Sequence, residues 1–415
     1  MKASAKPRLL SLNTYNYRRG GSDAAFLEND RLFSSHGWDT AVFTMRHPKN
    51  EPSPWSEYFA EEIEFGFDYS LMQKLVMAGR VIYSLDARRK LNRLLERFLP
   101  DVAHAHCIYH HLSPSVLPLL RERGIPTVMT AHDLKIACPA YKMFNQHGVC
   151  ERCKQGNLLN VAVHRCVHGS LALSTLIMLE SSVHRFLGLY RDNLDRVIVP
   201  SKFYGEKLGE WGWPREKLVY IPNYIDAENF EPQYSPGDYF LYFGRLAPEK
   251  GIDTLIRAAV RLGVRLKIAG TGPSEQELRT LAGQATSVEF LGHCTGERLW
   301  RLVREARAVV LPSKWYENAP LCVLEAYASG KPVIGARIGG IAEMVREGET
   351  GFLFESDEVE DLSRAVQHVA TLRDDQLAEM GRASRQYVGD SFTRQQYFER
   401  TLDLYRSLGV RLRAQ

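Results

Sequence analysis

Short apolar runs alternate with helix-patterned segments along almost the whole chain of 415 residues, and this alternation restricts the fold more than any other feature. It is typical of βα units, in which helices connect the parallel strands of one sheet. A chain of this length is too long for one hydrophobic core, so we expect two domains. The predicted fold class is therefore α/β, with two Rossmann-like, doubly wound parallel-sheet domains.

The expected strands are the short apolar runs. In the first half they lie at 8–12, 40–44, 102–105, 127–130 and 196–200. In the second half they lie at 239–243, 265–269, 287–291, 308–311 and 332–335. Helical patterns begin near Asp23 and Ile252 and cover 321–329 and about 393–408. Each half therefore repeats the βα pattern often enough for a sheet of its own.

The domain boundary is expected near Ile221–Asp226 (IPNYID), where Pro and Asn interrupt regular structure. Residues 1–224 then form the first domain and 225–391 the second. The amphipathic end of the chain, about 392–415, is expected to pack back on the first domain. Ligands of open parallel sheets bind outside the carboxyl ends of the strands, so two such sheets would face each other across one ligand-binding cleft.

Charge is distributed unevenly between the two halves. The net charge is only +4, yet residues 1–224 contain 29 Lys and Arg against 22 Asp and Glu. This balance fits an anionic ligand or a phospholipid surface, whereas a nucleic-acid-binding module would be far more basic. The sequence shows no apolar run long enough to span a membrane and no signal-peptide pattern, and its seven cysteines fit a reducing compartment. We therefore predict a cytoplasmic protein without a nucleic-acid partner.

Arg245 and Lys250 lie five residues apart in FGRLAPEKG (243–251), directly after an expected strand. A planar guanidinium that binds two oxygens and a point-like ammonium form a good pair for a pyrophosphate. A solvated surface pair is the alternative.

Glu317 and Glu325 stand eight residues apart in the segment from 312 to 340. Pro320 fits the first helical position, so Glu317 belongs to the strand-to-helix turn and Glu325 to the helix. Glu317 would accept hydrogen bonds from hydroxyls and Glu325 from a diol, unless Glu325 is simply solvated. An anion would lie between them at the helix start, where the dipole and the free N–H groups favour it. Those groups belong to Asn318, Ala319, Leu321 and Cys322.

Two further features leave alternatives open. Cys138, Cys150, Cys153 and Cys166 lie within 29 residues, one pair as C-x2-C, and either hold a structural Zn²⁺ or remain free or packed thiols. The stretch 69–97 combines an apolar stripe with basic residues. It either lies on anionic lipid or forms a core-facing helix with a solvated basic side. The basic residues are Arg80, Arg88, Arg89, Lys90 and Arg93.

Taken together, the motifs resemble glycosyltransferase family 4, the retaining nucleotide-sugar enzymes with the GT-B fold. The second half matches in FGRLAPEKGIDTLIRA, LKIAGTGP, VEFLGH, GETGFLF and the segment 311–345, which contains the E-x7-E pair. The first half matches in the Gly20–Gly21 loop, HAH (104–106), TAHD (130–133) and VIVPS (197–201). The resemblance covers nearly the whole chain and implies the GT-B architecture.

The resemblance also implies roles on the donor side. Arg245 and Lys250 would neutralise the donor diphosphate, so that no catalytic metal or other cofactor is needed. Glu317 would hold hydroxyls of the transferred sugar, and Glu325 the ribose. Backbone near Gly292 and His293 would contact the base.

The first domain would supply the acceptor-binding residues and the side of the cleft that faces the donor. His132 would touch the donor sugar, and the Gly20–Gly21 loop would approach the phosphates or the acceptor. His104 and His106 alternate on a strand, with a structural or an acceptor-side role, and His110 would line the acceptor cleft.

The function implied is transfer of a hexose from a nucleoside diphosphate sugar to a glycan or lipid-linked sugar, in surface polysaccharide biosynthesis. Such a protein would work in the cytoplasm, with an anionic membrane surface as a further partner at its inner face. Two alternatives are a non-hydrolysing nucleotide-sugar epimerase and a catalytically silent subunit that binds nucleotide sugar or glycan.

Overall fold

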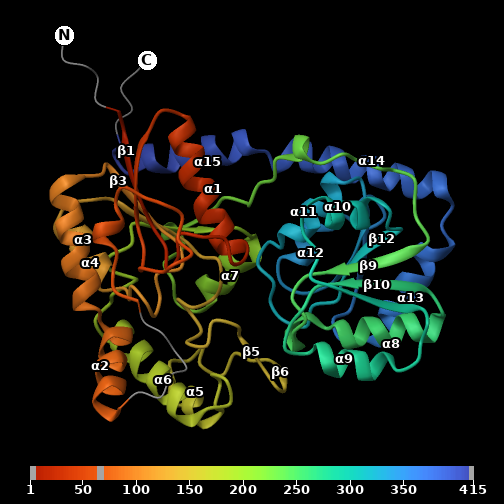
Figure 1. The fold of residues 1–415 in the computed structure, drawn as a ribbon, viewed down its shortest axis with the longest axis horizontal. Coiled ribbons are helices and arrows are strands. Elements are labelled where there is room, and N and C mark those ends of the chain that lie inside the picture. The colour runs from red at the N-terminus through yellow and green to blue at the C-terminus, as the bar shows by residue number, and fades with distance from the viewer. Residues whose placement is uncertain (1–5, 63–69, 411–415) are drawn as a thin grey trace.

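A computed structural model describes residues 6–62 and 70–410, which form two α/β domains side by side (Figure 1). Each domain is built on a sheet of six parallel strands. Four of these strands, Val102–Ala105 (VAHA) among them, are buried along their whole length, because helices cover both faces of a parallel sheet. Within the described residues, no helix is both long enough and apolar enough to cross a bilayer.

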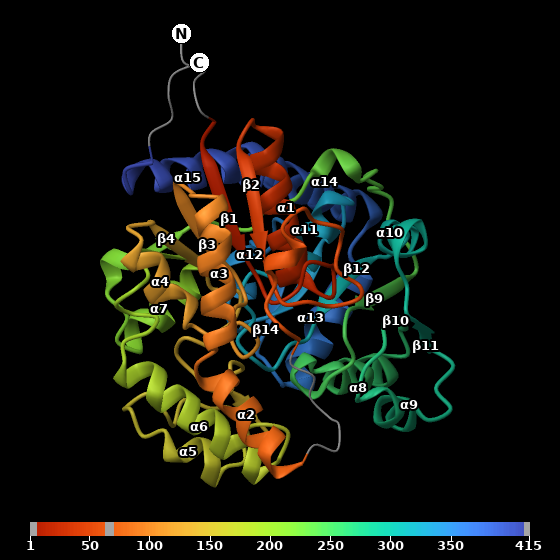
Figure 2. The same ribbon diagram turned by 60° about the vertical axis from the view of Figure 1, so that its left-hand side comes forward.

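The first sheet has the strand order β2-β1-β3-β4-β7-β8. Its strands are β1 (Arg8–Leu12), β2 (Asp39–Phe43), β3 (Val102–Ala105), β4 (Thr127–Thr130), β7 (Arg196–Val199) and β8 (Leu218–Tyr220). One face packs against α3 (Leu85–Arg97), α4 (Val116–Glu122) and α7 (Lys202–Glu210), and the other against α1 (Gly21–Ser35) and α15 (Arg394–Ser407). A smaller group, α2 (Leu71–Ile82), α5 (Leu159–Val163) and α6 (Leu171–Phe186), lies at one end of the domain (Figure 2).

The second sheet has the order β11-β10-β9-β12-β13-β14. Its strands are β9 (Tyr239–Phe243), β10 (Arg265–Ala269), β11 (Val288–Gly292), β12 (Ala308–Leu311), β13 (Val333–Ala336) and β14 (Gly351–Phe354). One face packs against α8 (Ile252–Leu262), α9 (Glu275–Ala282) and α13 (Val359–Thr371). The other packs against α10 (Gly296–Arg304), α11 (Leu321–Ala328), α12 (Ile341–Met344) and α14 (Asp374–Ser391). Both sheets are thus doubly wound, as predicted.

All ten expected strands form: six have the predicted bounds, three are shifted by one residue, and the strand expected at 196–200 ends one residue earlier. Two strands were not expected, β8 and β14, and both are edge strands of three or four residues. A hairpin of β5 (Phe144–Asn145) and β6 (Gly148–Val149) was also not expected. The stretch 70–97 forms two helices, α2 and α3, and α3 buries its apolar stripe in the core. Tyr69, the first residue of the predicted stretch, lies outside the described residues.

The chain passes between the domains twice. Ile221 packs with the first domain and Ile225 with the second. After α14 the chain returns, and α15 buries Phe398 and Tyr405 against the first sheet (Figure 1). The two crossings lie beside each other, because the N–H of Ile225 donates to the carbonyl of Phe392 over 3.0 Å. Residues 411–415, which the prediction included in the returning end, lie outside the described residues.

Candidate active site

The amino ends of two helices, one from each domain, meet between the sheets. A Cβ on Gly21, the first residue of α1, would lie 3.9 Å from Cδ1 of Leu321, the first residue of α11. Gly20 caps α1 and has free space around it. Free N–H groups at both helix starts favour an anion, so this meeting point can receive negatively charged oxygens from either side.

Lys250 and Glu317 form an ion pair beside this point. The ammonium lies 2.7 Å from Oε1 of Glu317, which also accepts a hydrogen bond of 2.7 Å from the hydroxyl of Ser313. Burial alone would raise the pKa of Glu317, but Lys250, together with the hydrogen bond from Ser313, outweighs it and holds the pKa below its usual value. Lys250 also lies over the ring of Trp315, 5.0 Å from its centroid. The site therefore contains one cation held in place by a charged carboxylate.

Glu325 lies one turn inside α11 with a different electrostatic environment. Burial raises its pKa to about 7, and Arg18 from the first domain only partly opposes this rise. Burial also raises the pKa of Cys322, with contributions from Glu325 and Glu317 and an opposing one from Lys250. Because all three charged groups act on the Cys322 thiol, Glu317, Glu325 and Lys250 surround the start of α11. Glu325 can therefore exist in either protonation state near neutral pH.

Arg245 is bound to a carboxylate of its own turn. Its guanidinium pairs with Oε1 of Glu249, and the ammonium of Lys142 from the first domain lies 3.1 Å from the same oxygen. Burial opposes ionisation of Glu249, but a backbone hydrogen bond and the two cations hold its pKa below the usual value. The Arg245 side chain itself is half exposed. Two cations thus share one carboxylate across the domain boundary.

Three histidines of the first domain stack in a row behind this cleft. The rings of His104 and His106 are 4.5 Å apart, and those of His106 and His132 are 5.1 Å apart. His106 Nδ1 lies 2.8 Å from His132 Nε2, while His104 lies within 2.7 Å of the hydroxyls of Tyr405 and Thr130. Burial lowers the pKa of His132 to about 4 and that of His104 to about 3. All three rings are therefore neutral at pH 7.

Asn318 connects the second domain to the backbone around His132. Its amide nitrogen donates to the carbonyl oxygens of Ala131 (2.9 Å) and His132 (3.3 Å), and its Oδ1 accepts from Ser201 (2.9 Å). Gly340 packs directly on this residue, since a Cβ there would lie 1.6 Å from the Asn318 carbonyl oxygen. The glycines after α11 therefore allow the backbone of the Glu317–Asn318 turn to come close.

Two other predicted donor residues are Ala319 and His293. Ala319 contributes its carbonyl oxygen to a 3.0 Å hydrogen bond from Asn223, in the crossing between the domains. His293 is exposed in the loop after β11, where Gly292 has a φ of +66°.

The predicted acceptor residues are more enclosed than expected. His106 is completely buried, so it reaches the cleft only through His132. His110 Nδ1 lies 2.9 Å from the buried carboxylate of Glu180, which also binds the ammonium of Lys135 at 2.7 Å. This network ties α6 to the loop after β4.

Two family models match the chain and together cover most of it. Residues 20–229, half of the chain, match the model described as Glycosyltransferase Family 4. Residues 226–387 match the model described as Glycosyl transferases group 1. The chain belongs to glycosyltransferase family 4.

Relatives of this glycosyltransferase act on several substrates by their names. The glycogen synthase of Mycobacterium tuberculosis (strain ATCC 25618 / H37Rv) is 29% identical over 359 residues, which are 82% of this chain and 77% of the relative. From the same strain, the GDP-mannose-dependent α-(1-6)-phosphatidylinositol monomannoside mannosyltransferase is 29% identical over 247 residues, 53% of this chain and 63% of the relative. The relatives support sugar transfer, but their names point to different substrates.

Solved structures of similar fold cover nearly the whole glycosyltransferase. Sucrose-phosphate synthase from Thermosynechococcus elongatus superposes with a TM-score of 0.73 at 21% identity, over 98% of this chain and 99% of that one. Anabaena HepE in complex with UDP superposes with a TM-score of 0.66 at 17% identity, over 97% and 100%. The predicted GT-B fold is therefore confirmed.

The four cysteines between 138 and 166 lie near one another in the glycosyltransferase, since the other three thiols all act on the pKa of Cys153. All are free thiols, and within residues 6–62 and 70–410 no group of three or more His, Cys, Asp or Glu could hold a metal ion. Burial and the neighbouring thiols raise the pKa of Cys153 to about 12, and burial raises that of Cys138 to about 11. The structural Zn²⁺ at these cysteines stays a prediction, and free or packed thiols remain its alternative.

Sequence reasoning did not find two residues that contact the cleft, Lys142 and Glu249. Glu249 stands in the PEKG turn next to Lys250, and this position could have identified it as a residue of the site. Lys142 pairs with Glu249 over 107 positions of sequence, which no local pattern predicts.

Proposed function

We propose that this family 4 glycosyltransferase is a retaining, metal-independent enzyme. It moves a hexose from a nucleoside diphosphate sugar to a sugar hydroxyl of a glycan or lipid-linked acceptor, in the cytoplasm and in surface polysaccharide biosynthesis. The observation that carries the proposal is the Lys250–Glu317 ion pair beside the meeting amino ends of α1 and α11. A diphosphate would find a cation and two sets of N–H donors there.

The chemical step needs negative charge to be stabilised on the leaving diphosphate. As the bond from the anomeric carbon to the phosphate oxygen breaks, Lys250 and the N–H groups of α11 stabilise the charge that develops. Arg245 would exchange Glu249 for a phosphate oxygen, and Lys142 remains to balance Glu249. These groups replace a metal ion in the proposal.

The sugar would keep its stereochemistry through attack on one face. The acceptor oxygen bonds to the anomeric carbon on the side that the phosphate leaves, and the departing phosphate oxygen takes the acceptor proton. Neutral His132 would hydrogen-bond the transferred sugar, Glu317 would accept from its hydroxyls, and Glu325 from the ribose. Water is excluded from such a step when the cleft closes over it.

The acceptor would approach between the β5–β6 hairpin and the phosphate-binding turn. A cavity of about 620 Å³ lies there, lined by residues 144–149 of the first domain and by Ala247, Pro248 and Ile252 of the second. Its size suits one or two sugar units.

The experiment that tests the proposal starts with thermal shift measurements against UDP, GDP, dTDP and ADP. The nucleotide that stabilises the protein is then supplied as its diphosphate sugars, and release of the nucleoside diphosphate is measured with and without added chelator. We expect slow hydrolysis of one donor, unchanged by the chelator.

Three outcomes separate the proposal from its alternatives. A sugar that stays on the nucleotide with inverted stereochemistry at one carbon would identify an epimerase. Nucleotide binding without any turnover would identify a silent binding subunit. Absence of binding to all four nucleotides would overturn the donor site itself.

A further inference from the structure

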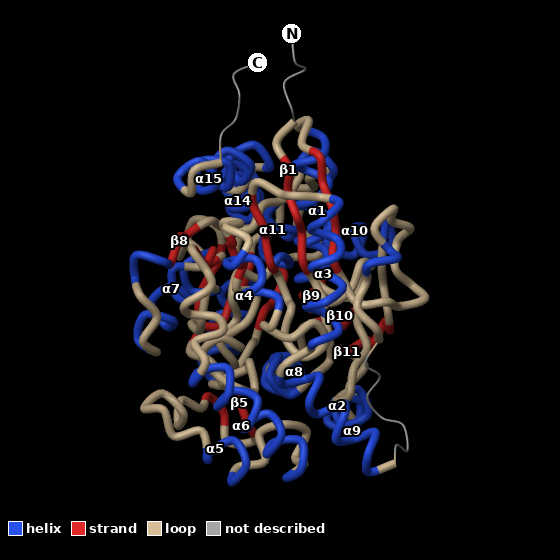
Figure 3. Tube along the Cα trace, turned by 90° about the vertical axis from the view of Figure 1, so that its left-hand side faces the viewer, coloured by secondary structure: helices blue, strands red, loops and turns tan. Residues whose placement is uncertain are grey.

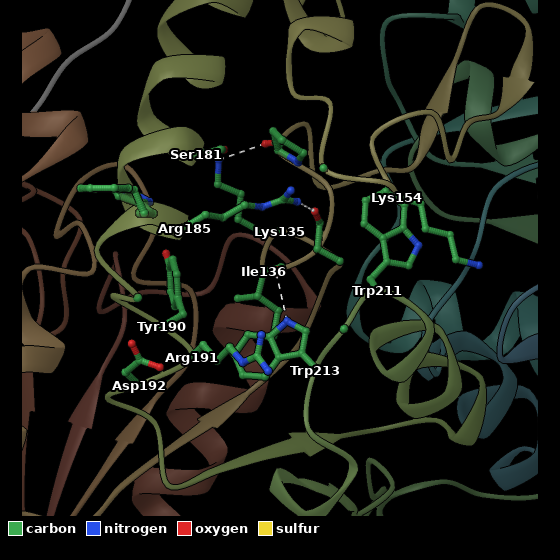
Figure 4. Close-up of a pocket in the computed structure, with 17 residues that line it drawn as sticks. Lys135, Ile136, Lys154, Ser181, Arg185, Tyr190, Arg191, Asp192, Trp211 and Trp213 are labelled. Carbon is green, nitrogen blue, oxygen red and sulfur yellow. Dashed lines mark hydrogen bonds between the residues drawn. The ribbon is translucent and has the colours of Figure 1, made fainter.

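Helix α7 of the first domain lies at the border with the second domain (Figure 1), beside the edge strand β8 (Figure 3). The segment that follows its carboxyl end is anchored inside the first domain. There the buried indole of Trp213 donates to the carbonyl oxygen of Ile136 over 3.1 Å (Figure 4). A contact that the second domain makes with α7 therefore joins it to the first domain as a whole.

The amino end of α7 is bound by the second domain. The carboxylate of Glu343, in α12, accepts the N–H groups of Lys202 and Phe203 over 3.1 and 3.2 Å. These are the first two residues of α7, where N–H groups have no partner within the helix and the helix dipole favours a negative charge. Ser201, which caps α7, donates to Asn318 of the second domain over 2.9 Å. Two side chains of the second domain thus hold this helix start.

Tyr316, the residue before Glu317, packs against the side of α7. Its ring lies 4.8 Å from that of Phe203, and the ammonium of Lys207 lies 5.1 Å from its centroid. Its carbonyl oxygen accepts a 3.1 Å hydrogen bond from the hydroxyl of Tyr204. By sequence this tyrosine belongs to the second domain, yet its side chain packs against the core of the first.

The hydroxyl of Tyr316 donates to a carboxylate of the first domain. It lies 2.8 Å from Oε1 of Glu151, and the ammonium of Lys207 lies 2.8 Å from the same oxygen. Burial raises the pKa of Tyr316 to about 12, and Glu151 adds to the rise, so the hydroxyl keeps its proton. Burial alone would raise the pKa of Glu151, but the bonds from Lys207 and Tyr316 hold it below its usual value. The bond therefore has a charged acceptor, which makes it stronger than a neutral one.

Glu317 stands between two residues that are bound to the first domain. Tyr316 bonds to it through its hydroxyl, and Asn318 through its amide group at the carbonyl of His132. Glu317 itself is only 7% exposed and pairs with Lys250 of its own domain. The position of this carboxylate therefore depends on both domains, although the residue belongs to the second.

We propose that Tyr316 is a positioning residue of the donor site, through which α7 and Glu151 set the turn of Glu317 when the domains come together. The transferred sugar would meet a correctly oriented carboxylate only in that arrangement. With the domains apart, Tyr316 and Glu343 would lose their partners together, and the turn would be free to shift. The effect on turnover rests on the proposed function, whereas the contact between the domains can be measured without a donor.

The first test is donor turnover by Tyr316→Phe, which keeps the ring and removes the hydroxyl. We expect kcat to fall about tenfold and KM for the donor to change less than about twofold, because Arg245 and Lys250 still bind the diphosphate. Glu151→Ala should behave in the same way, and the double variant should be no slower than either single one, since all three lose the same bond. Glu151→Gln, which keeps an oxygen acceptor, should recover part of the loss.

The matched control is Glu210→Ala. Glu210 also accepts from the ammonium of Lys207, over 3.1 Å, but its second bond is to Lys154 of the first domain. The variant therefore takes one carboxylate from the same cation and leaves the bond of Tyr316 in place. Its kcat should equal that of the wild type. A fall as large as in Glu151→Ala would assign the effect to Lys207 and contradict the proposal.

The second test is hydrogen exchange at Lys202 and Phe203 in the full chain, without any donor. Their N–H groups bond to Glu343 across the domain boundary, so they exchange when the domains separate. We expect exchange at least about tenfold faster in Tyr316→Phe than in the wild type, and no change in Glu210→Ala.

Two outcomes would overturn the proposal: unchanged exchange in Tyr316→Phe, and faster exchange with an unchanged kcat. A wild type that shows the expected exchange but turns over no donor sugar would contradict the proposed function, while the contact that Tyr316 makes between the domains would be supported.

Discussion

The imidazole of His132 lies parallel to that of His106, and one hydrogen is shared between His132 Nε2 and His106 Nδ1 over 2.8 Å. Nε2 of His106 is buried and has no hydrogen-bond partner among the described residues. Protonating His106 would therefore place an uncompensated charge in the core, and burial accordingly keeps its pKa well below the usual value. The row of histidines makes the stability of the first domain dependent on pH.

We expect the protein to lose stability as the pH falls from about 6.5 to about 4. The unfolded chain takes up protons on His104 and His132 in this range, whereas the folded chain, with pKa values of about 3 and about 4, does not. For His132 alone the difference amounts to about 3 kcal/mol. Urea unfolding at a series of pH values measures this dependence.

The control is His104→Gln, which can keep hydrogen bonds to Tyr405 and Thr130 but removes one titrating group. Its stability should fall less steeply with acid. The raised pKa of Glu325 makes the protein more stable as the pH falls, in both the wild type and the variant. The quantity to compare is therefore the difference in unfolding free energy between the wild type and His104→Gln at each pH. Identical slopes would show that the buried ring does not stay neutral.

Lys250→Met should damage both stability and turnover. It leaves the buried carboxylate of Glu317 without its ion partner, and breaking a buried pair costs about 3–5 kcal/mol. Loss of the cation should lower donor turnover about a hundredfold or more. The double variant with Glu317→Gln removes the unpaired charge and should recover most of the stability in urea, but none of the turnover. Recovery of turnover in the double variant would contradict the role of Lys250.

Glu325 should make donor binding dependent on pH near neutrality. Its pKa in the free protein is about 7, and a ribose diol donates hydrogen bonds more strongly to the charged carboxylate. Affinity for the donor sugar, which has no phosphate titrating in this range, should therefore rise between pH 6 and pH 8 in calorimetry. Glu325→Gln should bind about tenfold more weakly and without this pH dependence. A pH dependence that persists in the variant would come from another group.

Gly340→Ala should displace the turn that carries Glu317 and Asn318. The new Cβ would lie 1.6 Å from the Asn318 carbonyl oxygen, and such overpacking costs about 1–3 kcal/mol or more. Donor turnover should fall, because Asn318 bonds to the backbone at His132. Gly389→Ala in α14 has free space and should be neutral or slightly stabilising. Thermal unfolding and turnover of the two variants, measured together, test the packing.

Local patterns were sufficient for most of the fold and for the residues that surround the start of α11. Apolar runs located the long strands, and Pro320 located the helix start, because both depend on neighbours in sequence. Patterns failed for β8 and β14, edge strands whose apolar runs, LVY and FLF, are only three residues long. They also missed contacts such as Lys142 with Glu249, which only the packing of two domains creates.

Helix α6 shows a different limit. Its apolar side chains are regularly spaced, and sequence reasoning assigns such a stripe to the core by default. Burial of Glu180 and His184 instead turns the stripe outward, because Lys135 and His110 already compensate the carboxylate from inside the domain. The direction of an amphipathic helix therefore depends on partners that lie far away in the chain.

The hydrogen bond between Ile225 and Phe392 has a mechanical consequence. Because the two connections are joined at neighbouring points, we expect the domains to rotate about the line through them more easily than they slide past each other. A joint of this kind would bring Arg245, Lys250 and His132 back to the same relative positions each time the domains close.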